Sequence, residues 1–275
     1  SSLTVSRDIV LIDSGGFTIQ FDSELDGIIS GNGILAKTGS GELTLTGANT
    51  YEGGVQAYAG TVSDSADKNL GDPSGPLALR NATLRVTSSF TSNRNLSLVT
   101  SGGTIETQAD YTLNGNITGV GPLVKTGSST LTLSGTSTYT NGTNINAGTV
   151  SIDSDSSLGD TSGDISLTSS TLAATGSFTT SRGISLSTSG TFDTSATLTA
   201  NGVVSGTGQL IKTGSSFLVL GGVNTYSGGT ALNGGTVQIS SDSNLGTSNL
   251  SFTTGTLQTT ADITTSKTLS ITTSG

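Results

Sequence analysis

The sequence contains no cysteine, histidine, methionine or tryptophan among its 275 residues, and only 3 prolines. The lack of cysteine excludes a disulfide scaffold and a thiolate metal site. The lack of histidine excludes Ser-His-Asp and Cys-His catalytic sites. Charged residues make up only 11% of the chain, and its formal net charge of −9 includes no basic cluster. Nucleic acid is therefore not an expected partner, because phosphate binding needs a concentrated cationic surface.

Long apolar runs are also missing. No run approaches the length of a membrane span, and no basic-then-apolar signal segment opens the chain. The sequence starts without methionine, and its repeat register breaks off within a repeat at both ends, so we expect a segment of a longer protein. The low charge invites an interpretation as disordered chain, but β-branched residues in regular alternation argue against disorder.

A repeat of 87 to 88 residues organises the sequence. The motif occupies residues 33–71, 121–159 and 208–246, and its second copy reads GPLVKTGSSTLTLSGTSTYTNGTNINAGTVSIDSDSSLG. Lys37, Lys125 and Lys212 mark the same position, so the spacings are 88 and 87 residues. Units that cannot bury an apolar face alone must stack on their neighbours, which predicts a repeat architecture.

Within each period, apolar residues alternate with polar ones over three to five positions, as in LTL at 131–133 and ISL at 165–167. This pattern predicts short β-strands. A sandwich, a propeller and a parallel β-helix all fit it. The irregular strand spacing and the scarcity of tight hairpin turns favour the β-helix. The period would then divide into about four coils of roughly 22 residues. We predict one continuous all-β segment over residues 1–275, with about twelve coils.

Three aligned lysines, Lys37, Lys125 and Lys212, each precede Thr-Gly. A lysine can activate a catalytic serine, but three identical catalytic lysines about four coils apart would have no evident use. Gly-rich segments punctuate strands. We therefore interpret the lysines as turn residues with solvated ammonium groups.

Three aspartates, Asp67, Asp155 and Asp242, also align across the copies. An aspartate before a turn is typical of an Asx-type cap on backbone amides. A weak calcium site and a catalytic role are the alternatives. Calcium-binding solenoids of the nonapeptide kind need a GGxGxD repeat, which the sequence lacks.

The aromatic residues follow the repeat as well. Tyr51, Tyr139 and Tyr226 align, and we interpret them as turn-packing residues rather than as a glycan-stacking platform. Phenylalanines recur near strand positions and are predicted to lie in the core: Phe17, Phe90, Phe178, Phe192 and Phe252. One segment, FDSELDG at 21–27, departs from the repeat, and its Asp22 and Glu24 could line the groove of a polysaccharide-cleaving β-helix.

The phrases KTG, LTL, STY and INAGTV within residues 125–150 resemble the autotransporter-associated β-strand repeat of Gram-negative type V secreted proteins. The first copy departs from that pattern at Glu42 and in VQAYAG at 55–60. The resemblance implies a right-handed parallel β-helix. It also implies export through the periplasm and outer membrane, with the outer-membrane β-barrel of the same precursor as a partner. The passenger would then be secreted or displayed at the cell surface.

The function expected from this resemblance is that of a non-enzymatic stalk that supports passenger translocation and folding. Adhesion to a host-cell surface or to an extracellular matrix component, or to a second copy of itself, would be its wider role. We expect no catalytic, cofactor-binding or metal-binding residue. A polysaccharide-cleaving lyase or tailspike-like enzyme and a self-associating biofilm adhesin remain the alternatives, since function resides in sites grafted onto a fold.

Overall fold

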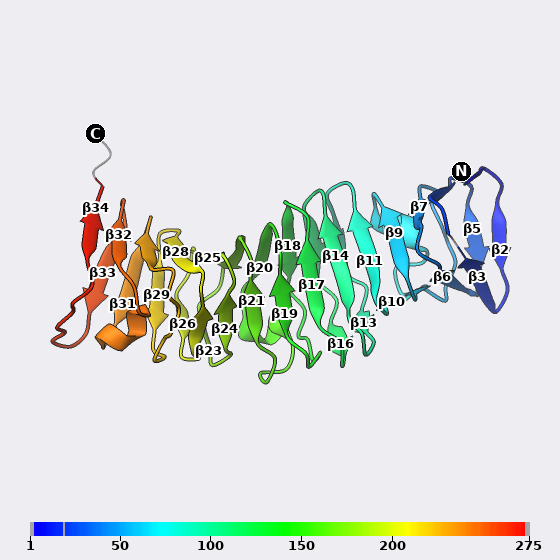
Figure 1. Cartoon of the computed structure of the whole chain (residues 1–275). Coiled ribbons are helices and arrows are strands. Elements are labelled where there is room, and N and C mark those ends of the chain that lie inside the picture. Colours follow the sequence, from blue (N-terminus) through cyan, green and yellow to red (C-terminus); the bar gives the residue numbers. More distant parts are fainter. Residues whose placement is uncertain (1–2, 19, 273–275) are drawn as a thin grey trace. The chain divides into compact units, whose positions relative to one another are not determined.

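The computed structural model describes residues 3–18 and 20–272, and the side chains of residues 14–18 lie outside this description. The chain forms two compact units, residues 1–141 and 142–275, each of which is described by itself. Each unit is a stack of short parallel strands (Figure 1). Together they comprise about 13 coils, which confirms the prediction of a parallel β-helix. The continuity of the segment over residues 1–275 stays a prediction.

In the first unit, the chain visits three faces in turn. One face comprises β1 (Leu3–Val5), β4 (Ser23–Leu25), β7 (Glu42–Leu45), β9 (Gly60–Asp64), β11 (Ala82–Val86), β14 (Gly103–Thr107) and β17 (Leu123–Thr126). A second comprises β3 (Ser14–Thr18), β6 (Ile34–Thr38), β8 (Val55–Ala57), β10 (Leu77–Leu79), β13 (Leu96–Leu98) and β16 (Ile117–Gly119). The remaining strands are β2 (Ile9–Leu11), β5 (Ile29–Gly31), β12 (Phe90–Ser92), β15 (Tyr111–Leu113) and β18 (Thr130–Leu133), with the 3₁₀ helix η1 (Asp67–Leu70).

The second unit follows the same plan. One sheet holds β19 (Thr143–Ile145), β21 (Ile165–Leu167), β24 (Ile184–Leu186) and β27 (Val204–Gly206). Another holds β20 (Thr149–Ile152), β22 (Ser170–Ala174), β25 (Ser189–Thr194), β28 (Gln209–Thr213), β30 (Thr230–Leu232), β32 (Leu250–Phe252) and β34 (Leu269–Ile271). The third holds β23 (Phe178–Thr180), β26 (Leu198–Ala200), β29 (Phe217–Leu220), β31 (Thr236–Ile239) and β33 (Thr256–Thr259), and the 3₁₀ helices are η2 (Asp155–Leu158) and η3 (Asp242–Leu245).

Alternating side chains build the core because every second residue of a strand points inward. In the first unit, the parallel register stacks one apolar column through Leu35, Val55, Leu77, Leu96 and Ile117. Each of these side chains is at most 2% exposed. Burying such a side chain stabilises the fold by about 1.5–3 kcal/mol. The column therefore accounts for much of the cohesion between successive coils.

The strand register shows how the repeat maps onto the solenoid. Lys125 is the equivalent of Lys37 in the preceding copy. Four coils before Lys125, however, the register reaches Leu43 and not Lys37. The repeat is therefore longer than four coils, by about a third of a coil. Equivalent strands of successive copies consequently fall in different sheets.

This shift is visible within each unit. In the first unit, β6 of the first copy lies in the second face, whereas its equivalent β17 lies in the first. In the second unit, β19 and its equivalent β30 also lie in different sheets. Equivalent side chains of successive copies therefore do not build one shared platform.

The Thr-Gly turn after each aligned lysine requires glycine. Gly127 has a φ of +76°, and an added Cβ would lie 2.3 Å from the carbonyl oxygen of Thr107. A side chain would thus meet both a strained backbone and the preceding coil. Among the described residues, the structure contains no helix that is long and apolar enough to cross a membrane.

Candidate functional site

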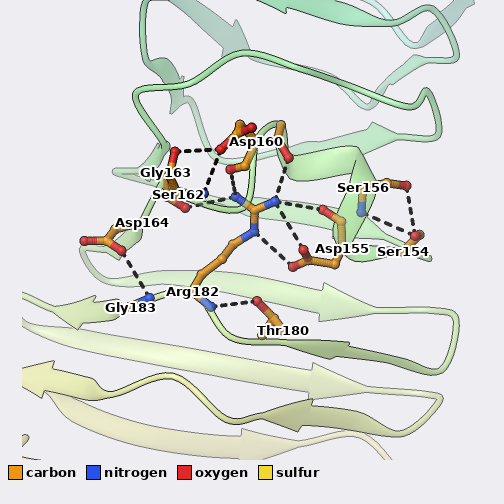
Figure 2. Close-up of polar contacts among 11 residues, drawn as sticks. Ser154, Asp155, Ser156, Asp160, Ser162, Gly163, Asp164, Thr180, Arg182 and Gly183 are labelled. Atoms are coloured by element: carbon orange, nitrogen blue, oxygen red, sulfur yellow. Dashed lines mark hydrogen bonds and ion pairs between the residues drawn. The ribbon is translucent and has the colours of Figure 1, made fainter.

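A buried arginine forms an extensive polar cluster in the second unit (Figure 2). Arg182 is 2% exposed. Its Nε donates to Asp155 Oδ1 at 3.0 Å, and its two Nη groups donate to the carbonyl oxygens of Asp155 at 3.2 Å, Gly159 at 2.7 Å, Gly163 at 2.9 Å and Asp160. One guanidinium therefore satisfies four carbonyls and one carboxylate of the loop that contains η2. We call this cluster the arginine clamp.

The first unit contains the same clamp one repeat earlier. Arg94 is 1% exposed and donates from Nε to Asp67 Oδ1 at 2.8 Å. Its Nη groups donate to the carbonyl oxygens of Asp67 at 3.0 Å, Gly71 at 2.6 Å, Gly75 at 3.0 Å and Asp72. The clamp joins β-solenoid coils that are adjacent in space and 19 to 27 residues apart in sequence.

The third copy uses a lysine in place of the arginine. Lys267 Nζ donates to Asp242 Oδ2 at 2.7 Å and to the Asp242 carbonyl oxygen at 3.4 Å. An ammonium is a point charge, whereas the planar guanidinium offers five donors in a fixed fork. The third copy therefore holds its loop through fewer contacts than the arginine clamps do.

The aspartates that align across the copies do not cap backbone amides, so that expectation is wrong. The carboxylates of Asp67, Asp155 and Asp242 accept from the basic side chains instead. Ser154 and Ser241 cap η2 and η3. The corresponding residue before η1 is Ala66, and no side chain caps that helix.

Asx-type turns do occur, but at two other aspartates. Asp160 Oδ1 accepts from the Ser162 amide at 2.9 Å and from its hydroxyl at 2.6 Å, and Asp72 makes the same contacts with Ser74. These hydrogen bonds hold the pKa of Asp160 and of Asp72 below the usual value for aspartate, because they stabilise the ionised form. Both turns present the loop carbonyls to the clamp.

The expectation that the aligned lysines are turn residues with solvated ammonium groups is wrong. Lys37, Lys125 and Lys212 are inward-facing residues of β6, β17 and β28, just before the Thr-Gly turn. Lys37, Lys125 and Lys212 are each 0% exposed. Lys37 Nζ donates to the carbonyl oxygens of Thr38 at 2.9 Å, Gly39 at 2.8 Å and Ala59 at 3.1 Å. The Thr-Gly turn curls its carbonyls inward around the ammonium, which explains the burial.

The same ring of carbonyls surrounds the other two lysines. Lys125 donates to Thr126 and Gly127, both at 2.8 Å, and Lys212 donates to the carbonyl oxygens of Thr213, Gly214 and Gly234. Burial lowers the pKa of Lys125 and of Lys212 to about 8. In Lys37 and Lys212 the ammonium joins its own turn to the next coil, 22 residues later.

The aligned tyrosines are buried, which agrees with packing and not with a glycan platform. Tyr51, Tyr139 and Tyr226 are each 0% exposed, and the Tyr226 hydroxyl lies 2.6 Å from Thr230 Oγ1. Among the predicted core phenylalanines, Phe192 is fully buried. Phe90, Phe178 and Phe252 are half-buried, because each sits at a strand end, and the side chain of Phe17 lies outside the described residues.

Buried asparagines form a second polar ladder that the sequence analysis missed. Asn224 Oδ1 accepts from the Val204 amide at 2.7 Å, and its Nδ2 donates to the Asn244 carbonyl oxygen at 2.6 Å. Asn49 makes the same pair of bonds with Ile29 and Asn69 in the first unit. Both asparagines stand two residues before an aligned tyrosine, and this shared position in the repeat could have indicated them.

Among the described residues, the buried carboxyl group of Asp64 lacks a hydrogen-bond partner on either oxygen. Asp64 is 1% exposed, and neither of its side-chain oxygens accepts or donates a hydrogen bond. Burial, and then the nearby Asp67 carboxylate, raise its pKa well above the ordinary value, although Arg94 opposes this shift. The equivalent positions in the other copies are Ile152 and Ile239, which are ordinary core residues.

The segment at 21–27, expected to form a groove in the enzymatic alternative, lines only a shallow depression of about 200 Å³ with Leu3, Thr4 and Thr44. Its Asp22 accepts from the Glu42 amide at 3.1 Å. No group of three or more acidic residues in the described part of the chain could hold a metal ion. The absence of catalytic, cofactor-binding and metal-binding residues stays a prediction.

The repeats match a known family model. The passenger-associated-transport-repeat model matches residues 35–63, 123–152 and 210–239, which lie inside the three motif copies. These segments contain the buried lysine, the aligned tyrosine and the paired strands that follow it. No solved structure matches the chain.

A curated relative is the adhesin BmaC autotransporter of Brucella suis biovar 1 (strain 1330). It is 36% identical over 261 residues, which cover 86% of this chain and 8% of the relative. The chain thus spans about a twelfth of the relative's length. Both comparisons confirm the resemblance to autotransporter passengers that the repeat motifs indicate.

Proposed function

Since this chain is a segment of an autotransporter passenger that carries passenger-associated-transport repeats, we propose that it folds coil by coil after export and so supports display of the passenger. Passengers of this kind reach the cell surface through the outer membrane. The supporting observation is the set of clamps and lysine rings that join several pairs of neighbouring coils. Each joins residues at most 27 positions apart, so it can form as soon as the neighbouring coil has emerged.

The proposed stalk also explains the unusual composition. Its internal ion pairs and carbonyl rings use few charged residues, and the remaining polar surface consists mainly of serine, threonine and asparagine. We propose that the segment has no enzymatic activity and that the passenger takes part in adhesion to a host-cell surface or extracellular matrix component. The curated relative is named as an adhesin, which supports this proposal without identifying a receptor.

Surface display tests the folding role. Leu131 and Leu133 are buried in β18, whereas Thr132 between them faces outward and is half-buried. Leu131→Asp and Leu133→Asp in the full passenger should strongly reduce display at the cell surface, measured by antibody labelling of intact cells. Thr132→Asp is the matched control and should leave display near wild type. Equal display of all variants would contradict coil-by-coil folding as a requirement for export.

Adhesion is tested separately with the purified 275-residue chain. Its binding to host cells, to immobilised matrix proteins and to immobilised copies of itself should be measured in parallel. Binding to cells or matrix would support adhesion through these coils. Binding only to itself would instead support self-association, and no binding at all would refute adhesion by this segment.

A further inference from the structure

The first copy departs from the repeat at one exposed place on the second face of the first unit. Tyr58 follows β8 and is 41% exposed, although asparagine, Asn146 or Asn233, stands at this position in the other copies. Arg80 follows β10, and threonine, Thr168 or Thr253, replaces it elsewhere. The same backbone hydrogen bond to the preceding coil defines these equivalent positions.

These two departures lie against each other. The Arg80 guanidinium carbon lies 5.6 Å from the centroid of the Tyr58 ring. The Tyr58 hydroxyl donates to Gln56 Oε1 at 2.6 Å, which fixes the ring across the end of the strand. Together with Ala78 and Val99, these residues line a depression of about 160 Å³.

The guanidinium in this depression is available for binding. Among the described residues, no acidic group forms an ion pair with Arg80, and none accepts a hydrogen bond from its side chain. The strongly buried cations Arg94, Lys37 and Lys125 of the unit are by contrast occupied by carbonyls or carboxylates. A guanidinium held on an aromatic face still presents its planar fork of N–H donors, which matches a carboxylate bidentately.

We propose that the Tyr58–Arg80 depression is a subsite for one acidic sugar residue, a pyranose ring that carries a carboxylate, at the end of a surface glycan. The guanidinium would bind the carboxylate, Gln56 would bind ring hydroxyls, and the apolar wall of Val99 and the Tyr58 ring edge would contact the C–H face of the sugar. This inference rests on the proposed adhesive function and names the ligand class for it.

The geometry favours a sugar over an acidic peptide. Peptides that dock on sheets normally add a strand and use backbone hydrogen bonds. Here β8 already pairs with β6 and β10, and β10 also pairs with β13. The amides of Tyr58, Arg80 and Val99 likewise donate to the preceding coil at 2.8, 2.9 and 3.0 Å. Only side chains remain for recognition, and the depression is well below the size of pockets that enclose drug-sized ligands.

The test uses the purified 275-residue chain with glucuronic acid, N-acetylneuraminic acid and neutral glucose as probes, observed by ligand saturation-transfer NMR. A single small subsite predicts a Kd on the order of millimolar for the acidic sugars. We expect Tyr58→Asn and Arg80→Thr to weaken that binding at least about tenfold, since about 1.4 kcal/mol corresponds to a factor of ten. Both substitutions install the residue that the other copies carry, so the coils should remain folded.

Matched controls come from the second copy. Asn146→Ala and Thr168→Ala change the equivalent positions and should leave sugar binding unchanged. Equal binding of glucose and of the acidic sugars would overturn the proposal, as would wild-type binding in Tyr58→Asn and Arg80→Thr. Displacement of the sugar by an acidic peptide at lower concentration would assign the depression to peptides and also overturn it.

Host-cell binding by the same variants separates the two proposals. If acidic sugars bind through Tyr58 and Arg80 while the chain fails to bind cells, the subsite stands and the adhesive function fails. If cells bind but no acidic sugar does, the adhesive function stands and the subsite fails.

Discussion

The coil that contains η1 in the first unit and the coil that contains η2 in the second have the same clamp. They differ in the core beside it, where the first unit buries polar groups without hydrogen-bond partners. In the first unit, Asp64 occupies the position of Ile152, and both of its oxygens lack partners. The Tyr51 hydroxyl also lacks a hydrogen-bond partner. In the third copy Thr230 forms a hydrogen bond with Tyr226, but Val55 occupies the equivalent position in the first copy and has no hydroxyl. The clamp therefore forms even where buried polar groups in the neighbouring core lack hydrogen-bond partners.

The same region shows a third polar substitution. Tyr111 occupies the position of Leu198, and its hydroxyl is also buried without a hydrogen-bond partner. Burial raises the pKa of Tyr111, with the Asp64 carboxylate as the next cause. Unpartnered buried polar groups cost about 1–3 kcal/mol each. The first unit should consequently be the less stable of the two around η1.

The largest effect is expected from removing a clamp. Arg182→Ala would leave the Asp155 carboxylate and four carbonyls of the η2 loop without their donor, which should cost about 3–5 kcal/mol. Arg94→Ala should cost a similar amount in the first unit. Urea unfolding of the whole chain would measure both. Arg7→Ala, at an exposed arginine of the same repeat position, is the control, and equal midpoints for all three variants would refute a stabilising clamp.

Replacing the unpartnered carboxyl should remove much of the difference between the units. Asp64→Ile installs the residue of the other copies and should stabilise the first unit by about 1–3 kcal/mol at neutral pH. The folded-state pKa of Asp64 is raised, so the folded chain holds a proton that the unfolded chain releases above about pH 4. Stability of the wild-type unit should therefore fall as pH rises from about 4 toward the folded pKa.

The pH dependence supplies the control for this variant. The advantage of Asp64→Ile over wild type should shrink at about pH 3, below the ordinary aspartate pKa, where the carboxyl is largely protonated in both states. Ile152→Asp is the mirror variant and should give the second unit the same pH-dependent loss. The account fails if Asp64→Ile leaves the unfolding midpoint unchanged at pH 7.5, measured by urea titration.

The smallest effect concerns the tyrosine hydroxyl. Val55→Thr would place a hydroxyl where Thr230 meets Tyr226 at 2.6 Å, and one net hydrogen bond contributes about 1 kcal/mol. Thermal unfolding of the first unit should shift upward slightly. Val55→Ala controls for lost packing, and a midpoint for Val55→Thr no higher than that of Val55→Ala would show that the hydroxyl gains no partner.

Much of this architecture could be predicted from alternation and repetition in the sequence. The short strands, their parallel stacking and the packing of Tyr51 and Tyr226 all follow from residue patterns along a single copy. Lysine burial could not be predicted in this way, because the Thr-Gly turn supplies only part of the carbonyl ring around Lys37, and Ala59 of the next coil completes it. A local pattern describes the turn but not the coil above it.

The clamp was missed for a similar reason. Asp67 and Arg94 lie in different coils, and nothing local to either residue indicates the other. The repeat spacing between Arg94 and Arg182 could have indicated the clamp. Separately, an aspartate at position 64, where the other copies have isoleucine, could have indicated the unpartnered carboxyl group.

The displacement of equivalent strands to a different sheet in each successive copy could not be predicted either. It depends on the length of every coil within the repeat, and these lengths differ. The coil that leads from Leu43 to Val62 is shorter than the coil that leads from Val62 to Leu84. Turn residues alone do not indicate how much chain each coil takes up, so only the strand register reveals the shift.

The most direct test of the account is hydrogen exchange of the whole chain at pH 5 and pH 8, resolved by mass spectrometry over β9–η1 and over β20–η2, after correction for intrinsic exchange. The account predicts that protection of β9–η1 falls between pH 5 and pH 8 while that of β20–η2 stays constant, and that Asp64→Ile abolishes the difference. Equal pH responses of the two segments, or an unchanged response in Asp64→Ile, would contradict it.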